Sequence, residues 1–232
     1  MKRVIGILAA TLVVILMSAC GKDPDEPRDV YFSVLGDSYS TFQDYVDPET
    51  NAVWSYYDTI GINKVEQMWW WQVAQGMGWT LDHNNSFSGS LVCNMNFANW
   101  YGPHSFLRRM DELGNPDVIL VFGGTNDVWD EAPMGDFVYE NWTEEELCEF
   151  RPALACLFSG LQQLYPQATV YFMADSDLGD VFMESVHIIT DYYGVGCIDL
   201  YGIKKWWLHP NAEGMASIAR QVMEVLNREV NA

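Results

Sequence analysis

An apolar run passes directly into a small polar turn in the stretch Val30-Tyr31-Phe32-Ser33-Val34-Leu35-Gly36-Asp37-Ser38. A short apolar run bounded by turn residues predicts a buried strand. In an α/β protein, the turn after such a strand lifts its side chains into the crevice at the carboxyl edge of the sheet. Ser38 is therefore a candidate nucleophile, although a Gly-Asp-Ser sequence taken alone more often forms only a turn.

Apolar runs and helical patterns alternate along the rest of the chain. Four further strands are predicted, at residues 80–84, 118–122, 170–173 and 196–200. Helices are predicted over residues 65–77, 106–113, 147–161, 181–193 and 211–230. Thr143 and Glu146 form a capping box ahead of the third of these helices, and Pro152 within it predicts a kink or a break.

Five strands that alternate with helices predict an α/β fold, a three-layer α/β/α sandwich around a parallel sheet. The common five-stranded arrangement is flavodoxin-like, with strand order 2-1-3-4-5 and a crevice between strands one and three. Strand one runs into Asp37-Ser38, and strand three runs into residues 123–127, Gly-Gly-Thr-Asn-Asp. We therefore expect these two polar loops to meet at one edge of the sheet.

The polar loops contain the groups that acyl transfer from an ester requires, namely a nucleophile, a base and donors for the oxyanion. Ser38 supplies a hydroxyl, and Asn126 can supply a side-chain N–H₂ from the neighbouring loop. Residues 84–90, Asn-Asn-Ser-Phe-Ser-Gly-Ser, follow the second strand and offer a flexible backbone whose N–H groups can turn inward. His209 lies just before the last helix, at the same edge of the predicted sheet, and is the candidate base.

Four short motifs in this order resemble those of the SGNH (GDSL-like) hydrolases. They are Gly36-Asp37-Ser38 for block I, Ser88-Gly89 for block II, Gly124-Thr125-Asn126-Asp127 for block III and His209-Pro210-Asn211 for block V. The chain also looks like a Bacteroidetes lipoprotein branch of this family. The resemblance implies that Ser38 is the nucleophile and His209 the general base. It implies an oxyanion hole formed by the Ser38 N–H, the Gly89 N–H and the Asn126 side chain, with no metal and no organic cofactor.

Block V departs from the family pattern Asp-x-x-His, because Trp206 stands three residues before His209. The base still needs its Nδ1–H held so that Nε2 faces the serine. The main-chain carbonyl of Trp206 is our first candidate for this role, which would make the site a Ser–His dyad. A carboxylate from elsewhere, such as Asp177 or Asp199, is the alternative.

The N-terminus has the features of an export signal. Lys2-Arg3 precede an apolar stretch, and Met17-Ser18-Ala19-Cys20 resembles a bacterial lipobox. We expect a signal peptide over residues 1–19, lipidation at Cys20 followed by a flexible tether to residue 28, and a hydrolase domain over residues 29–232. This predicts a lipid-anchored protein of the cell envelope, in the outer membrane, with surface exposure as a further option. The alternative is an ordinary secretory signal beside an incidental Cys20.

The net charge limits the possible binding partners of the protein. The net charge of −20, from 32 acidic and 12 basic residues, disfavours nucleic acid and anionic membrane as direct partners. Contact with a membrane is thus expected only through the lipid.

Four cysteines besides Cys20 allow three disulfide pairings, but we expect them to act as small buried hydrophobic residues. No cluster of histidines and cysteines has the spacing of metal ligands.

We expect a serine ester hydrolase that acts on an O-acyl ester, with an acetylated carbohydrate as the preferred substrate class. Aromatic residues in the insertion after block I, namely Trp54, Tyr56 and Tyr57, could form a wall that stacks on sugar rings. A short-chain lipase or thioesterase is the enzymatic alternative. A catalytically weak or inactive glycan-binding lipoprotein of the same fold is the alternative from another class.

Overall fold

A computed structural model of the chain describes residues 29–46, 61–95 and 104–230. Its centre is a sheet of five parallel strands in the order β2-β1-β3-β4-β5. The strands are β1 (Tyr31–Gly36), β2 (Thr80–Ser86), β3 (Val118–Phe122), β4 (Thr169–Asp175) and β5 (Gly196–Leu200). The predicted fold class and strand order are therefore confirmed.

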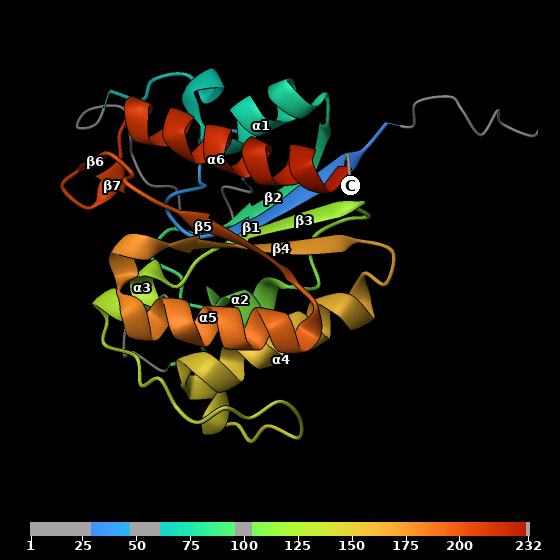
Figure 1. Ribbon diagram of the computed structural model, residues 1–232, viewed down its shortest axis with the longest axis vertical. Helices are drawn as coiled ribbons and strands as arrows, with labels where there is room; N and C mark the ends of the chain where they lie inside the picture. The colour runs from blue at the N-terminus through green and yellow to red at the C-terminus, as the bar shows by residue number, and fades with distance from the viewer. Residues whose placement is uncertain (1–28, 47–60, 96–103, 231–232) are drawn as a thin grey trace, which may run out of the picture.

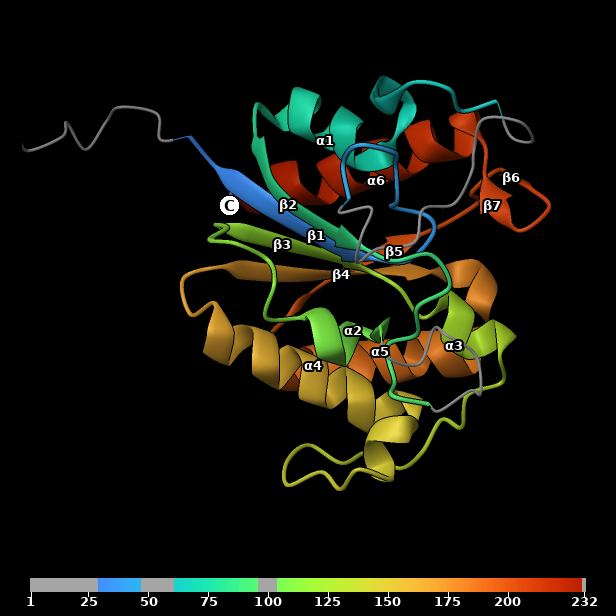
Figure 2. The same ribbon diagram turned by 180° about the vertical axis from the view of Figure 1, so that it is seen from behind.

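Helices cover both faces of the sheet and complete three layers (Figures 1 and 2). One face packs against α1 (Trp69–Met77) and α6 (Ala212–Val230), and the other against α2 (Phe106–Arg109), α4 (Phe150–Leu164) and α5 (Asp180–Tyr193). Successive strand residues point to opposite faces. In β3, for example, Leu120 belongs to the first core and Val121 to the second. This double burial explains why the strands are continuous apolar runs.

Two predicted helices begin later than their sequence patterns suggest. Residues 65–67 form a 3₁₀ turn, and Met68 is extended before α1 starts at Trp69. The Thr143–Glu146 capping box is present, but it lies at the start of a 3₁₀ turn, Glu146–Cys148, and not at the start of α4. Pro152 lies in the first turn of α4, where a missing N–H costs nothing, and the chain breaks at the extended Glu149 just before it.

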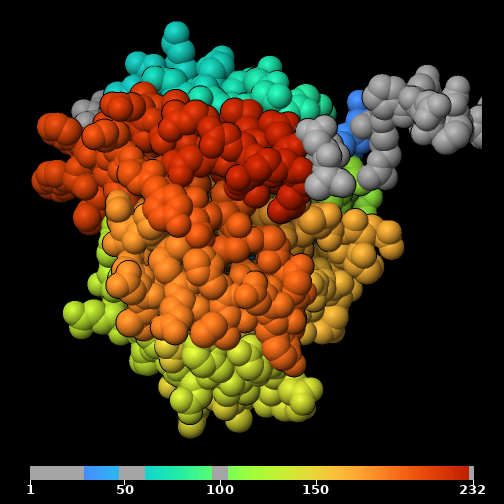
Figure 3. Space-filling view, viewed as in Figure 1, coloured from blue at the N-terminus to red at the C-terminus, as the bar shows by residue number. Residues whose placement is uncertain are grey.

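The segment before the last helix is more ordered than the sequence indicates. It forms a small antiparallel hairpin of β6 (Lys205–Trp206) and β7 (His209–Pro210), which projects beside the start of α6 (Figures 1 and 3). The connecting Trp207 has a φ of 55°, a left-handed conformation that a non-glycine residue adopts in tight turns. The segment expected to be a loop at His209 is therefore a hairpin with a defined backbone, and His209 lies in its second strand.

Some of the sequence-based predictions fall on residues outside the described ranges. These are the signal peptide, Cys20 and the tether, together with the aromatic residues 54, 56 and 57. Among the described helices, none has both the length and the apolar character needed to cross a bilayer.

Gly214 in the first turn of α6 is required by close packing against the hairpin. A Cβ at this position would lie 2.1 Å from the Lys204 carbonyl oxygen and 3.2 Å from Cβ of Pro210. Because backbone cannot move aside cheaply, we expect Gly214→Ala to lower the free energy of unfolding by about 2 kcal/mol, measured by chemical denaturation.

Gly76 in α1 is the matched control, because it is also helical but its added Cβ would meet only the flexible end of Met223. Gly76→Ala should therefore be close to neutral, since alanine favours the helix. Equal losses in the two variants would contradict this account of Gly214.

Candidate active site

The sheet topology brings Ser38 and His209 together from opposite ends of the domain. Ser38 follows β1, and His209 begins β7 just before α6. His209 Nε2 lies 3.0 Å from Ser38 Oγ, within hydrogen-bonding distance. Both residues are largely buried, with relative exposures of 4% and 8%. The pair has the geometry of a hydroxyl beside a base.

Asn126 lies in the first turn of α3 (Thr125–Trp129), directly after β3. Its side-chain Nδ2 donates to the Ser90 carbonyl at 2.9 Å and lies 3.4 Å from Asp37 Oδ2. The Ser90 contact ties the loop after β3 to the turn after β2. Gly89 lies in that turn, with a φ of 81°. The three predicted polar loops therefore meet at one edge of the sheet.

Two buried aspartates brace these loops. Asp37 Oδ1 accepts a hydrogen bond from the Tyr39 N–H at 2.9 Å. The Asp127 carboxylate accepts from the N–H groups of Val92 and Cys93 at 2.8 and 3.1 Å. Burial raises the pKa of Asp37 to about 7 and that of Asp127 to about 6, against the partly compensating hydrogen bonds. Both carboxylates accept hydrogen bonds from backbone N–H groups, and these contacts hold the loops in place.

Arg109, on α2, was not anticipated from the sequence. Its guanidinium donates to the Gly36 carbonyl at 3.2 Å, to Ser90 Oγ at 2.9 Å and to the Asn85 carbonyl. It therefore joins the end of β1 to the turn that contains Gly89. A charged residue within the apolar pattern of residues 106–113 was the available signal, but only the tertiary contacts reveal what it binds.

The backbone around His209 is held by neighbouring groups. Trp206 and His209 are paired residues of the hairpin, and the Trp206 side chain is 59% exposed. The Tyr39 hydroxyl donates to the Leu208 carbonyl at 2.5 Å, and the Tyr39 and His209 rings pack edge-on with centroids 5.4 Å apart. Burial lowers the pKa of His209 from 6.5 to about 4, so the imidazole is neutral at pH 7.

The two carboxylates considered as alternative partners of His209 contact other groups. Asp177 Oδ2 lies 3.1 Å from Lys205 Nζ, which also bonds to the buried Asp175 at 2.6 Å. Asp199 Oδ1 lies 2.8 Å from His187 Nε2.

In the described part of the chain the four cysteines are free thiols, with Cys93 buried and the others half-buried.

Comparison with known proteins identifies the family of this chain. A family model for GDSL-like lipase/acylhydrolase matches residues 30–226. The chain belongs to this family. Lipases and acylhydrolases cleave ester bonds. The resemblance inferred from the four motifs is confirmed. No curated protein matches this chain.

Two solved structures of similar GDSL-like proteins come from Bacteroides. A GDSL-like lipase from Bacteroides ovatus is 40% identical, covers 87% of this chain and all of its own, and superposes with a TM-score of 0.83. One from Bacteroides uniformis is 41% identical, covers 86% of this chain and 96% of its own, and has a TM-score of 0.82. A family two carbohydrate esterase from Clostridium thermocellum, in complex with cellohexaose, shares the fold at 14% identity, covering 88% of this chain and 66% of its own, with a TM-score of 0.61.

Removing the Arg109 guanidinium should destabilise this GDSL-like protein. In Arg109→Met, the buried acceptors at Gly36, Asn85 and Ser90 lose their donor, and each unsatisfied buried polar group costs about 1–3 kcal/mol. We expect the free energy of unfolding to fall by about 3–5 kcal/mol in a denaturant titration.

The neighbouring Arg108 is exposed and provides the matched control. Arg108→Met should change the free energy of unfolding by less than about 0.5 kcal/mol. A similar loss in both variants would mean that the Arg109 hydrogen bonds add nothing specific.

Proposed function

We propose that the protein is a serine ester hydrolase that acts through an acyl-enzyme. In this proposal Ser38 is the nucleophile and His209 is its general base. The observation that carries it is the 3.0 Å contact between His209 Nε2 and Ser38 Oγ. The low pKa of His209 supports it, because only a neutral imidazole can accept the serine proton.

The reaction takes two steps. Ser38 Oγ attacks the acyl carbonyl carbon while His209 Nε2 takes the hydroxyl proton, and the imidazolium then protonates the departing alkoxide. Water, deprotonated by the same imidazole, then attacks the acyl-serine. The bond from the acyl carbon to Ser38 Oγ breaks, the imidazolium returns its proton to Oγ, and a carboxylic acid is released. In both steps the oxyanion is received by the Ser38 N–H, the Gly89 N–H and the Asn126 side chain. For Asn126, this means redirecting an N–H that lies 3.4 Å from Asp37 Oδ2.

We assign the orientation of His209 to the main-chain carbonyl of Trp206. Pairing of these two residues across the hairpin supports this role. Replacing a charge-assisted hydrogen bond with a neutral one should cost about 1–2 kcal/mol, or roughly tenfold in rate. The protein is then a slower esterase than one with a full triad.

An O-acyl ester of a carbohydrate, with acetyl as the preferred acyl group, is the substrate we favour. Aromatic side chains suited to stacking on sugar rings lie near His209 in space or in the hairpin. The Trp129 and His209 ring centroids are 6.2 Å apart, and the hairpin residues Trp206 and Trp207 are 59% and 91% exposed. The distant carbohydrate esterase with bound cellohexaose is consistent with this choice. A short-chain lipase or thioesterase remains the second candidate.

The proposed setting is the cell envelope. Lipidation at Cys20 would anchor the domain to the outer membrane through the tether of residues 20–28. The net charge of −20 supports attachment through the lipid alone, because the protein surface would be repelled by anionic headgroups. Small-molecule or glycan esters are the proposed partners, and nucleic acid is not among them.

Loss of the nucleophile tests the proposed chemistry. The purified protein should release p-nitrophenol from p-nitrophenyl acetate, and Ser38→Ala should lower kcat/KM by about 10³-fold or more. His209→Gln should have a comparable effect, because the two groups act as a unit. His83→Gln is the control, since His83 is an exposed histidine next to Asp82 and away from Ser38.

Equal inactivity of the wild type and Ser38→Ala, on this ester and on acetylated oligosaccharides, would contradict the hydrolase. Retained binding of an oligosaccharide in that case, measured by calorimetry, would favour the glycan-binding lipoprotein.

The pH dependence tests the role of His209. The base acts in its neutral form, and burial lowers its pKa to about 4. We therefore expect kcat/KM to persist at pH 5, where an ordinary histidine of pKa 6.5 is mostly protonated, and to fall as the pH drops through about 4.

Asp37 also titrates near the site, because its pKa is raised to about 7. The profile is therefore best measured in both the wild type and Asp37→Asn, in which the limb near pH 4 should remain. A limb at pH 6.5 in Asp37→Asn would contradict a desolvated His209 base.

A further inference from the structure

A second cluster of reactive side chains lies on β5, outside the proposed active site. Cys197 and Asp199 are two residues apart in this strand, so their side chains share one face of the sheet. This is the face that α5 covers, and His187 of α5 lies beside them. His187 Nε2 lies 2.8 Å from Asp199 Oδ1, and Cys197 Sγ lies 3.5 Å from the same oxygen. One ligand atom from each residue lies within 4.8 Å of the other two.

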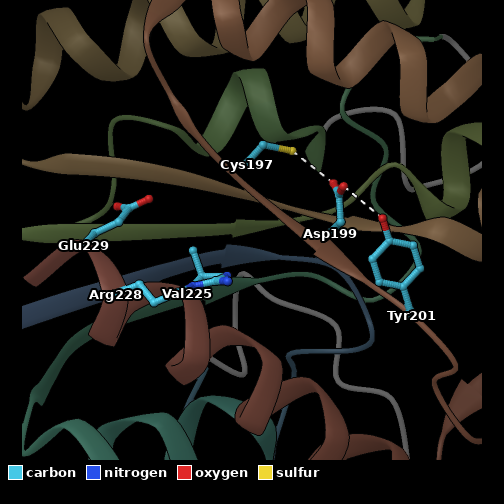
Figure 4. Close-up of a pocket in the computed structure, with 6 residues that line it drawn as sticks. All are labelled: Cys197, Asp199, Tyr201, Val225, Arg228 and Glu229. Carbon is cyan, nitrogen blue, oxygen red and sulfur yellow. Dashed lines mark hydrogen bonds between the residues drawn. The ribbon is translucent and has the colours of Figure 1, made fainter. Parts of the chain in front are cut away.

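The cluster is open to small solutes. Cys197 and Asp199 line a cavity of about 440 Å³ at the free edge of β5, which Tyr201 and residues of α6 complete (Figure 4). The His187 and Asp199 side chains are 45% and 27% exposed. An ion can therefore reach the cluster, and a water molecule has room beside it.

We propose that His187 Nε2, Cys197 Sγ and Asp199 Oδ1 form a binding site for a divalent transition metal, with Zn²⁺ as the best fit. In a tetrahedral zinc site, ligand atoms lie about 3.3–3.6 Å apart, as follows from metal–ligand bonds of about 2.0–2.3 Å. The three atoms already approach this spacing, and small side-chain rotations complete it. The fourth position would be taken by water from the cavity.

The ligand chemistry selects the metal. A thiolate and an imidazole favour zinc and its neighbours, whereas Mg²⁺ and Ca²⁺ require mainly oxygen ligands. A thiolate together with the Asp199 carboxylate would neutralise the two charges of the ion. The Tyr201 hydroxyl donates to Asp199 Oδ2 at 3.1 Å, so the outer oxygen is held and Oδ1 remains directed at His187 and Cys197. Such an outer hydrogen bond is typical of carboxylate ligands.

A cysteine nucleophile is the other chemistry that these residue types allow, and the contacts disfavour it. His187 Nε2 bonds to Asp199 rather than to the thiol, so it is not placed to take the thiol proton.

The site would act on stability rather than on ester chemistry. Between β5 and β1, which carries Ser38 at its end, lie β4 and β3. The metal would join β5, an edge strand, to α5, which packs on it. An ion that binds only the folded state stabilises it by mass action. At a free Zn²⁺ concentration of 100 times Kd, the midpoint of thermal unfolding should rise by about 5–10 °C.

Titration with Zn²⁺ alone, by calorimetry on the purified protein without a histidine tag and under reducing conditions, tests the proposal. We expect one ion per chain, and no binding of Mg²⁺ in the same concentration range. Co²⁺ in place of Zn²⁺ should give a thiolate-to-metal charge-transfer band in the near ultraviolet. Both signals should be lost in Cys197→Ser and weakened at least tenfold in His187→Gln.

Cys156→Ser and His83→Gln are the matched controls, because these residues lie outside the cluster, and both should bind as the wild type does. Asp199→Asn retains the thiol and provides a second variant if Cys197→Ser folds poorly. Its affinity for Zn²⁺ should also be at least tenfold lower than that of the wild type. Absence of stoichiometric binding, or a charge-transfer band that survives in Cys197→Ser, would overturn the proposal and leave only a hydrogen-bonded cluster.

Discussion

The parallel pairing of β1 with β3 is the constraint on which the rest of the structure depends. Gly36 lies opposite Phe122 at the carboxyl end of this pair, so the residues that follow both strands emerge side by side. Ser38 and Asn126 are 88 residues apart in the chain, and no local interaction could join them. The polar loops can lie at this edge because the buried apolar strands beneath them supply the stability that the loops themselves lack.

Buried ionisable side chains connect the loops around Ser38. Asp37, Asp127 and Arg109 are almost fully buried, and each is held mainly by backbone groups of the turns around Ser38. Desolvating these groups is unfavourable, as the raised pKa values of both carboxyls and the lowered pKa of Arg109, about 9, indicate. Their hydrogen bonds offset that cost and hold the loops in one arrangement, and such preorganisation is what stabilisation of an oxyanion requires.

In the proposed function, the backbone of the His209 hairpin takes the place of the carboxylate that the usual block V supplies. The carbonyl of Leu208 accepts from Tyr39, and Gly214 lets α6 approach Lys204 and Pro210 closely. Position 206 is therefore free to carry an exposed tryptophan instead of an aspartate. In the proposed function this exchange lowers the rate and adds an exposed aromatic side chain to the hairpin that carries His209.

The amino-acid sequence by itself determined the parallel α/β sheet, the strand order, the family, and the meeting of the segments that carry Ser38, Asn126 and His209, because apolar periodicity and strand-end motifs are local properties of the chain. It did not determine where α1 and α4 begin, since Met68 and Glu149 adopt extended conformations that a hydrophobic pattern does not encode. Nor did it reveal the hairpin around His209, the role of Arg109 or the meeting of His187 with Cys197 and Asp199. Those features depend on contacts between segments distant in the chain, and only the packing of helices onto the sheet decides such contacts.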